Sequence, residues 1–321
     1  MFKCLAYTCV ALFVLYAPSC KKDVLHWSKV QMLNSNTNSR LNRVRFLNDS
    51  VCIVAGGVKW AKSEILRSTD GGYNWGNMSD PNAEKGMYGI GTSPNGTLYL
   101  CGADGDVLYS KDAGINWVFR RILDWNRYTS LTFPTVDTGI FIASLAQDTG
   151  FITFVDSNFN IINTRKYGFG LNEIYMTNQS TGYVIGYGVA MKTGDCGTTW
   201  TFLDVEGDNF MAMDIHGNEI WMCGYNGSVY HTSDGGNNWT RYRNGNDITL
   251  PRYRLLSILF VDALNGWAVG EDGKIIYSDD GGRHWMEYKR FTTNALRSIV
   301  LCPNKDLLVA GDGGTLYRIT P

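Results

Sequence analysis

The sequence predicts an all-β fold, a seven-bladed β-propeller of four-stranded blades, from three observations. A pattern written S/T-x-D-x-G-x-x-W recurs along the chain, with its tryptophans at positions 75, 117, 200, 239 and 285. Most steps between them are near 40 residues, and the step from Trp117 to Trp200 is about double, as expected for propeller blades of which one has lost the pattern. A second phrase, G-x-x-G before a strand that ends in an aromatic residue, recurs upstream of the pattern and at the C-terminus.

Each copy of the pattern has the residues of a tight turn between two strands. Asp and Ser/Thr side chains accept hydrogen bonds from turn amides, Gly adopts the left-handed dihedrals, and Trp packs on the hairpin. We therefore interpret these residues as structural. The pattern resembles the Asp-box of BNR-type propellers, and its key residues are Asp70 and Trp75, Asp112 and Trp117, Asp195 and Trp200, Asp234 and Trp239, and Asp280 and Trp285.

Two blades lack a complete pattern. The third blade is expected to turn through Asp156-Ser157-Asn158, a plain turn sequence. The last unit, from Gly311, lacks an outermost strand and a Trp. We expect an N-terminal strand to close the ring in that last blade, with Trp27 beside Leu316-Tyr317.

The N-terminus reads as a targeting segment. An apolar run from Cys4 to Ala17 is typical of a signal peptide, and Ala17-Pro18-Ser19-Cys20 resembles a bacterial lipobox. The sequence thus predicts a signal peptide at 1–19, a lipidated tether at 20–24 with the lipid on Cys20, and the propeller at 25–321. The expected location is the cell envelope, as an outer-membrane lipoprotein that is periplasmic or surface-exposed; an unlipidated secreted protein is the alternative.

Net charge and the number and spacing of Cys and His residues argue against several classes of ligand and partner. The net charge of −1 does not point to nucleic acid. With Cys20 lipidated, an odd number of cysteines remains after cleavage, which is no disulfide framework. No C-x-x-C and no His pair at metal spacing occur, so we expect no metal, no cofactor and a monomer.

The G-x-x-G phrases, the Asp-boxes and strands such as Gly266-Trp267-Ala268-Val269-Gly270 together resemble the Ycf48/Hcf136 family of seven-bladed propellers, over about residues 25 to 321. The resemblance implies a binding protein, since that family assists photosystem II assembly by binding a reaction-centre protein. It also implies an arginine-rich patch.

Most arginines fall in the segments that join one blade to the next, on the face opposite the box turns. They are Arg40, Arg43, Arg45, Arg120, Arg121, Arg127, Arg165, Arg241, Arg243, Arg252, Arg254, Arg290 and Arg297. Arginine with aromatic residues is the composition of an interface. We select Arg120, Arg121, Arg127, Arg252, Arg254, Trp125 and Tyr253 as partner-binding residues, for an envelope protein or an anionic glycan. Solvated arginines on outer strands remain the alternative.

A glycan-binding module or a sialidase-like glycoside hydrolase is the alternative function, because such enzymes share the boxes. No Arg-Ile-Pro motif occurs near the first blade. A glycosidase would need a pair of carboxylates in the central pocket, and the candidates are Asp124, Glu173, Asp208 and Asp247. The sequence therefore favours a non-catalytic interaction or assembly propeller with no catalytic residue.

Overall fold

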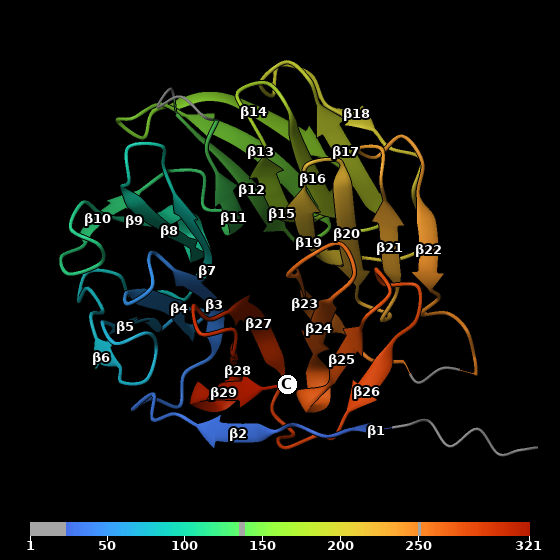
Figure 1. The fold of residues 1–321 in the computed structure, drawn as a ribbon. Coiled ribbons are helices and arrows are strands. Elements are labelled where there is room, and N and C mark those ends of the chain that lie inside the picture. Colours follow the sequence, from blue (N-terminus) through green and yellow to red (C-terminus); the bar gives the residue numbers. More distant parts are fainter. Residues whose placement is uncertain (1–23, 135–138, 250–251) are drawn as a thin grey trace, which may run out of the picture.

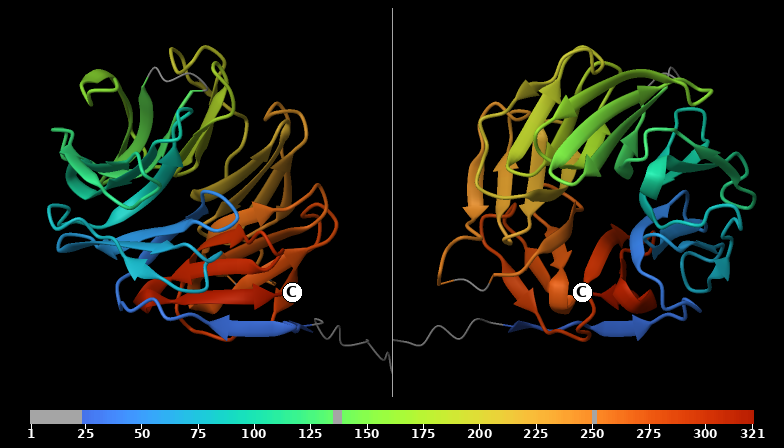
Figure 2. Two further views of the ribbon diagram at one scale, coloured as in Figure 1. Left: turned by 60° about the vertical axis from the view of Figure 1, so that its left-hand side comes forward. Right: turned by 180° about the vertical axis from the view of Figure 1, so that it is seen from behind.

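Seven sheets stand around a central axis in the computed structural model, which describes residues 24–134, 139–249 and 252–321 (Figure 1; Figure 2). Each sheet has four strands, and one carries a fifth, short strand. The predicted all-β, seven-bladed propeller is confirmed. The predicted signal peptide and Cys20 lie outside the described residues.

The first three blades follow one another along the chain. Blade 1 contains β3 (Leu41–Phe46), β4 (Cys52–Val58), β5 (Lys62–Ser68) and β6 (Gly76–Asn77). Blade 2 contains β7 (Met87–Thr92), β8 (Leu98–Gly102), β9 (Asp106–Ser110) and β10 (Val118–Arg121), with the 3-10 turn η1 (Ala103–Gly105) between β8 and β9. Blade 3 contains β11 (Arg127–Thr132), β12 (Ile140–Ala146), β13 (Thr149–Val155) and β14 (Ile161–Tyr167).

The next three blades repeat this order. Blade 4 contains β15 (Leu171–Met176), β16 (Gly182–Gly186), β17 (Val189–Thr193) and β18 (Thr201–Phe202). Blade 5 contains β19 (Phe210–His216), β20 (Glu219–Gly224), β21 (Val229–Thr232) and β22 (Thr240–Arg243). Blade 6 contains β23 (Leu255–Phe260), β24 (Gly266–Gly270), β25 (Ile275–Ser278) and β26 (Met286–Tyr288), with η2 (Glu271–Gly273) and the added strand β1 (Val24–Leu25).

Blade 7 joins the two ends of the described chain. It contains β27 (Leu296–Leu301), β28 (Leu307–Gly311), η3 (Asp312–Gly314) and β29 (Leu316–Thr320), and its outermost strand is β2 (Lys29–Met32). β2 pairs antiparallel with β29, from Lys29 opposite Thr320 to Met32 opposite Tyr317. The expected closure by an N-terminal strand is therefore found.

Trp27 lies one blade away from its expected place. Its ring stacks on Tyr288 of blade 6 with centroids 3.5 Å apart, and its indole N–H donates to the Lys289 carbonyl at 3.2 Å. The reason is the path of the chain: β1 first runs parallel to β26, and only then does the chain cross to β29. Trp27 lies at this crossover and packs against a hydrophobic cluster formed by residues of blades 6 and 7.

Apolar strands pack blade against blade. Between blades 1 and 2, for example, Ile53 and Ile65 pack with Met87, Leu98 and Leu100. Cys52, Cys101, Cys223 and Cys302 are buried and free, and burial raises the pKa of the Cys101 thiol to about 12. These thiols act as small core side chains.

The inner strands also bond to one another through side chains. Each bond runs from a backbone N–H of one inner strand to a side-chain oxygen on the inner strand of the preceding blade. The pairs are Met176 with Thr132, Met213 with Glu173, Phe260 with Asp214, Ile299 with Ser257, and Val44 with Ser298. Polar residues in apolar inner strands thus satisfy backbone donors that strand pairing leaves open.

The box turns have the expected geometry. In blade 1, Asp70 Oδ1 accepts hydrogen bonds from the amides of Tyr73 and Asn74 at 3.0 and 2.9 Å, and Trp75 Nε1 donates to the Gly72 carbonyl at 3.1 Å. The aspartates of the other four boxes likewise accept the amide four residues later. These aspartates are occupied in shaping turns.

Within the described residues, no helix is long and apolar enough to cross a lipid bilayer. No group of His, Cys, Asp and Glu side chains suited to a metal ion occurs in the same part of the chain.

Candidate functional site

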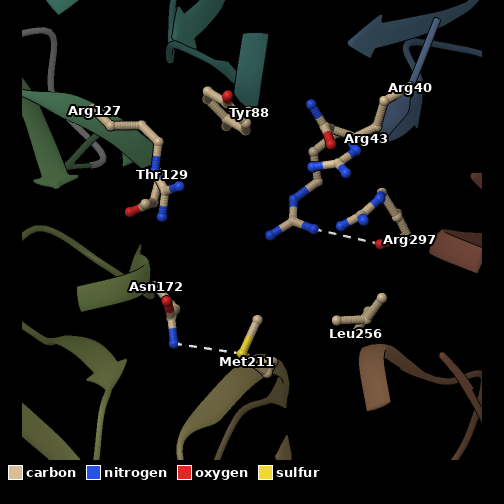
Figure 3. A pocket seen from close by; sticks show the side chains of 10 residues that line it. Arg40, Arg43, Tyr88, Arg127, Thr129, Asn172, Met211, Leu256 and Arg297 are labelled. Carbon is tan, nitrogen blue, oxygen red and sulfur yellow. Dashed lines mark hydrogen bonds between the residues drawn. The ribbon is translucent and has the colours of Figure 1, made fainter. Parts of the chain in front are cut away.

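The ring has two different faces. In blades 1 to 6 a turn joins the third and fourth strands, so the segment leading from the fourth strand to the next blade emerges on the opposite face. The inner strands begin at this opposite face, and their first residues surround a cavity of about 150 Å³ at the mouth of the central channel. Figure 3 shows its lining side chains, which are Arg40, Asn42, Arg43, Tyr88, Arg127, Thr129, Asn172, Met211, Leu256 and Arg297.

One half of this mouth is basic. Arg40 and Arg297 share a single carboxylate, Asp312, whose oxygens lie 3.0 Å from Arg40 Nε and 3.0 Å from Arg297 Nη2. Burial alone would raise the pKa of Asp312, but the hydrogen bond from Arg297 and the charges of both arginines outweigh it and lower the pKa. Asp312 is therefore ionised at neutral pH and neutralises only one of the two guanidinium groups.

Arg43 and Arg127 supply the remaining charge. Arg43 Nη2 lies 3.8 Å from Glu173 Oε1, too long for a hydrogen bond, and Nη1 lies 3.5 Å from the Arg297 carbonyl. Arg127 stacks over Tyr88 with its guanidinium carbon 5.5 Å from the ring centroid, and none of the nitrogens of its guanidinium group has a hydrogen-bond partner among the described residues. Both guanidinium groups therefore keep donors available for a ligand.

The other half of the mouth is uncharged. It is formed by Asn172, Met211 and Leu256 from blades 4, 5 and 6, which face the arginines across the opening in Figure 3. Asn172 Nδ2 donates to Asn209 Oδ1 and to the Phe210 carbonyl, both at 2.7 Å. The mouth thus places a fixed amide and two apolar side chains opposite the basic groups.

Deeper in the channel, Glu173 and Asp214 line a cavity of about 480 Å³. Burial raises the pKa of Glu173, although the charge of Arg43 offsets part of this rise. Glu173 Oε2 accepts the Met213 amide at 2.7 Å, and Asp214 Oδ2 accepts the Phe260 amide at 2.6 Å. One oxygen of each carboxylate is thereby used to tie neighbouring blades together.

The other candidate carboxylates lie in loops. Asp208 is buried and accepts the amides of Asn209, Asn226 and Ser228. Asp124 and Asp247 accept amides two residues later. Only Glu173 of the predicted set lines the channel. Asp214 was not in that set, although a carboxylate within an otherwise apolar inner strand was the available signal.

The seven predicted partner-binding residues are spread over the face. Arg120 and Arg121 lie on β10, the outermost strand of blade 2, where Arg121 Nε donates to the buried Asp106 at 2.6 Å. Trp125, in the next connecting segment, is 62% exposed. Arg127 alone of the seven lines the mouth.

The remaining three lie before the inner strand of blade 6. Tyr253 is buried between Arg243 and Lys274, whose charged groups lie 4.6 and 4.7 Å from its ring centroid. Arg254 lies over Tyr225 and pairs with Glu271, while Arg252 is exposed. Arg40, Arg43 and Arg297, which complete the basic half of the mouth, belong to the wider set of predicted arginines but not to the selected seven.

Comparison with known proteins confirms the predicted resemblance to Ycf48. The family model "Photosynthesis system II assembly factor YCF48" matches residues 162–251. Photosystem II assembly lipoprotein Ycf48 of Synechococcus sp. (strain CC9902) is 32% identical over 75 residues. That match covers 22% of this chain and 22% of the relative, so the chain matches about a fifth of that protein's length.

Solved structures share the fold. YCF48 from Cyanidioschyzon merolae superimposes with a TM-score of 0.67 at 15% identity, covering 91% of this chain and 98% of the other. YCF48 bound to D1 peptide gives a TM-score of 0.68 at 15% identity, with 93% and 98% covered. Virginiamycin B lyase from Staphylococcus aureus gives 0.73 at 11% identity, with 91% and 99% covered. At these identities the likeness establishes the propeller fold alone.

Proposed function

We propose that this protein is a non-catalytic assembly or interaction propeller that holds an acidic segment of an envelope protein at the arginine-lined mouth of its channel. The observation that carries the proposal is the imbalance of charge at the mouth. Four arginines line it, while Asp312 and Glu173 are the carboxylates paired with them. Guanidinium groups pair with carboxylates through two parallel hydrogen bonds, and part of that capacity is open on Arg43 and Arg127.

The similarity to Ycf48 supports a protein as the partner. A structural relative of this chain is YCF48 bound to D1 peptide, so a propeller of this type binds a polypeptide. The uncharged half of the mouth, with Met211 and Leu256, suits an apolar side chain next to the acidic one. An anionic glycan would engage the arginines but would leave these two side chains unused.

A glycoside hydrolase is the second candidate, because the raised pKa of Glu173 is a property of a general acid. Against it, Glu173 and Asp214 each use one oxygen to accept a backbone amide of the next blade. Release of a chromophore from nitrophenyl glycosides, abolished by Glu173→Gln in a folded protein, would establish the enzyme. We expect no turnover.

We further propose that a lipid on Cys20 anchors the propeller to the outer membrane. The curated relative is a lipoprotein, which supports the anchor but not the membrane. Growth with an alkyne-tagged fatty acid should label the protein, and Cys20→Ala should remove the label and release the propeller from the membrane fraction. Label retained in Cys20→Ala would contradict the anchor.

The binding proposal is tested with two synthetic decapeptides, one carrying two glutamates beside a leucine and the other carrying glutamines in their place. We expect the acidic peptide alone to bind, more weakly as salt rises. Arg43→Glu with Arg127→Glu should weaken binding at least tenfold, a change of about 1.4 kcal/mol. Arg120→Glu with Arg252→Glu reverses two exposed arginines outside the mouth and serves as the matched control.

Equal binding of the acidic peptide by the wild type and the Arg43/Arg127 variant would show that the mouth is not the binding site. Loss of binding only in the Arg120/Arg252 control would transfer the function to the wider face predicted from the sequence. Binding of heparin but of neither peptide would identify an anionic glycan as the partner.

A further inference from the structure

A second cleft opens on the same face as the channel mouth, between blades 4 and 5. It has a volume of about 600 Å³ and is lined by Tyr187, Gly188, Gly207, Asp208, Asn209, Tyr225 and Asn226. Asn209 connects it to the mouth, because Asn209 Oδ1 accepts the hydrogen bond from Asn172. No part of the proposed peptide site uses the cleft itself.

Two partly exposed tyrosines, Tyr187 and Tyr225, line this cleft. Tyr187 lies in the tight turn between β16 and β17 and is 68% exposed, while Tyr225 follows β20 and is 38% exposed. The guanidinium carbon of Arg254 lies 4.0 Å from the centroid of the Tyr225 ring. Arg254 Nε also forms an ion pair with Glu271 Oε2 at 3.4 Å. This stack covers one face of Tyr225 and fixes the ring before any ligand arrives.

The backbone around the cleft is already hydrogen-bonded. The amide of Tyr187 donates to Gly170, that of Gly188 to Asp208, and that of Tyr225 to Asn209. The Asp208 carboxylate accepts the amides of Asn209, Asn226 and Ser228, so most of its acceptor positions are occupied. A bound peptide strand would therefore find no row of free amides here.

What the cleft still offers is two ring faces and side-chain amides. Among the described residues, neither the amide of the Asn226 side chain nor Asn209 Nδ2 has a hydrogen-bond partner, and each can bond a hydroxyl group. A pyranose ring combines an apolar face of C–H bonds, which packs on an aromatic ring, with a rim of hydroxyl groups, which amides recognise. It carries no charge that would need an ion pair.

We propose that this cleft binds a neutral saccharide, stacked on Tyr187 and Tyr225 and hydrogen-bonded by Asn209 and Asn226. The site is separate in its chemistry from the arginine-lined mouth, so it adds a ligand class to the proposed function and does not depend on it. Because the two sites adjoin through Asn172 and Asn209, a saccharide in the cleft lies next to a peptide at the mouth.

The experiment measures binding of the hexamers of glucose, in both its cellulose and amylose linkages, and of N-acetylglucosamine by calorimetry. At least one hexamer should bind, and binding should not weaken with salt because the ligand is neutral. Tyr187→Ala and Tyr225→Ala should each weaken it about tenfold, as expected for loss of an aromatic stacking contact. Phe202→Ala, which truncates an exposed aromatic side chain outside the cleft, should leave binding unchanged.

To distinguish the cleft from the mouth, each set of variants is also tested with the ligand of the other site. Arg43→Glu with Arg127→Glu should leave saccharide binding intact, and the two tyrosine variants should leave acidic-peptide binding intact. Binding of none of the hexamers, or unchanged binding in both tyrosine variants, would overturn the saccharide site. Loss of peptide binding in the tyrosine variants would instead make the cleft part of the peptide site and would equally overturn it.

Discussion

The turns between the third and fourth strands of blades 1 and 3 differ in sequence but share a hydrogen-bond pattern. In blade 1 the Asp70 carboxylate accepts the amide and the side chain of Asn74. In blade 3, which has no complete box, Asp156 accepts the same two groups of Asn160, at 2.9 and 3.0 Å. An aspartate with an asparagine four residues later therefore makes the same carboxylate bonds on two different backbones, because the left-handed residues are Gly71 and Gly72 in blade 1 but Phe159 in blade 3.

The rest of the box secures the turn to the preceding blade. Trp75 packs in one cluster with Cys302 and Leu308 of blade 7, and the Ser68 hydroxyl accepts the Gly72 amide beneath it. Blade 3 has the exposed Ile161 in place of the tryptophan. There Phe159 contacts blade 2 instead, with its ring centroid 5.7 Å from that of Tyr109. The comparison teaches that the hydrogen bonds of the aspartate and blade-to-blade packing are separate functions of one motif.

Blade 7 differs further, because no turn connects its third strand, β29, to its outermost strand, which is the N-terminal β2. A chain beginning at Ser35 lacks β1, β2 and Trp27, and leaves the outer edge of β29 without a partner strand, although β29 still pairs with β28. We expect the largest loss of stability here, on the order of 5 kcal/mol, because a row of strand pairs and an aromatic stack vanish together. Urea unfolding followed by circular dichroism measures it. A chain beginning at Val24 is the control, and equal midpoints for the two chains would refute the seam.

The tryptophan of a box should matter more than the residue in its place in blade 3. Trp75 is only 7% exposed, so Trp75→Ala should lower the free energy of unfolding by about 3–5 kcal/mol. Trp239 is only partly buried, so Trp239→Ala should cost less. Ile161→Ala should change stability by about 0.5 kcal/mol or less, as for an exposed side chain. A cost for Ile161→Ala as large as for Trp75→Ala would disprove the division of functions.

The smallest loss of stability is expected from protonation of the turn aspartates at low pH. It should be similar in a turn with the complete box, such as that of Asp112, and in the turn of Asp156, which has none. The backbone amide of Asn116 lowers the pKa of Asp112 to about 2, and the side chain of Asn160 likewise lowers the pKa of Asp156. A lowered folded-state pKa stabilises the protein above the unfolded value of about 3.9, and this contribution is lost as the pH falls toward 2.

Asp112→Asn and Asp156→Asn should each reduce stability at pH 7 and make the decline between pH 4 and 2 shallower. Thermal melts across that range test both variants. A decline that stays as steep in either variant as in the wild type would show that its turn does not contribute.

The propeller was predictable because the box repeats a local hydrogen-bond pattern that needs particular residue types. The position of the seam followed from a missing strand, whereas the place of Trp27 did not, because the crossover of β1 onto blade 6 depends on contacts 262 residues apart. Of the residues selected for partner binding, Arg127 lines the mouth, whereas Arg120 and Arg121 lie on the outermost strand of blade 2, and binding by any of them stays a prediction. A sequence gives the order of residues along a blade but not their distance from the central axis, which decides which arginines meet.

The pairing of β2 with β29 also constrains how the chain folds during synthesis. The Ser28 hydroxyl donates to the carbonyl of Pro321, 293 positions later, so β2 waits unpaired until β29 has been made. At about 5–20 residues per second this interval lasts on the order of 15–60 seconds. Throughout it, β2 and the open edges of the unfinished ring are accessible to chaperones, proteases and other nascent chains.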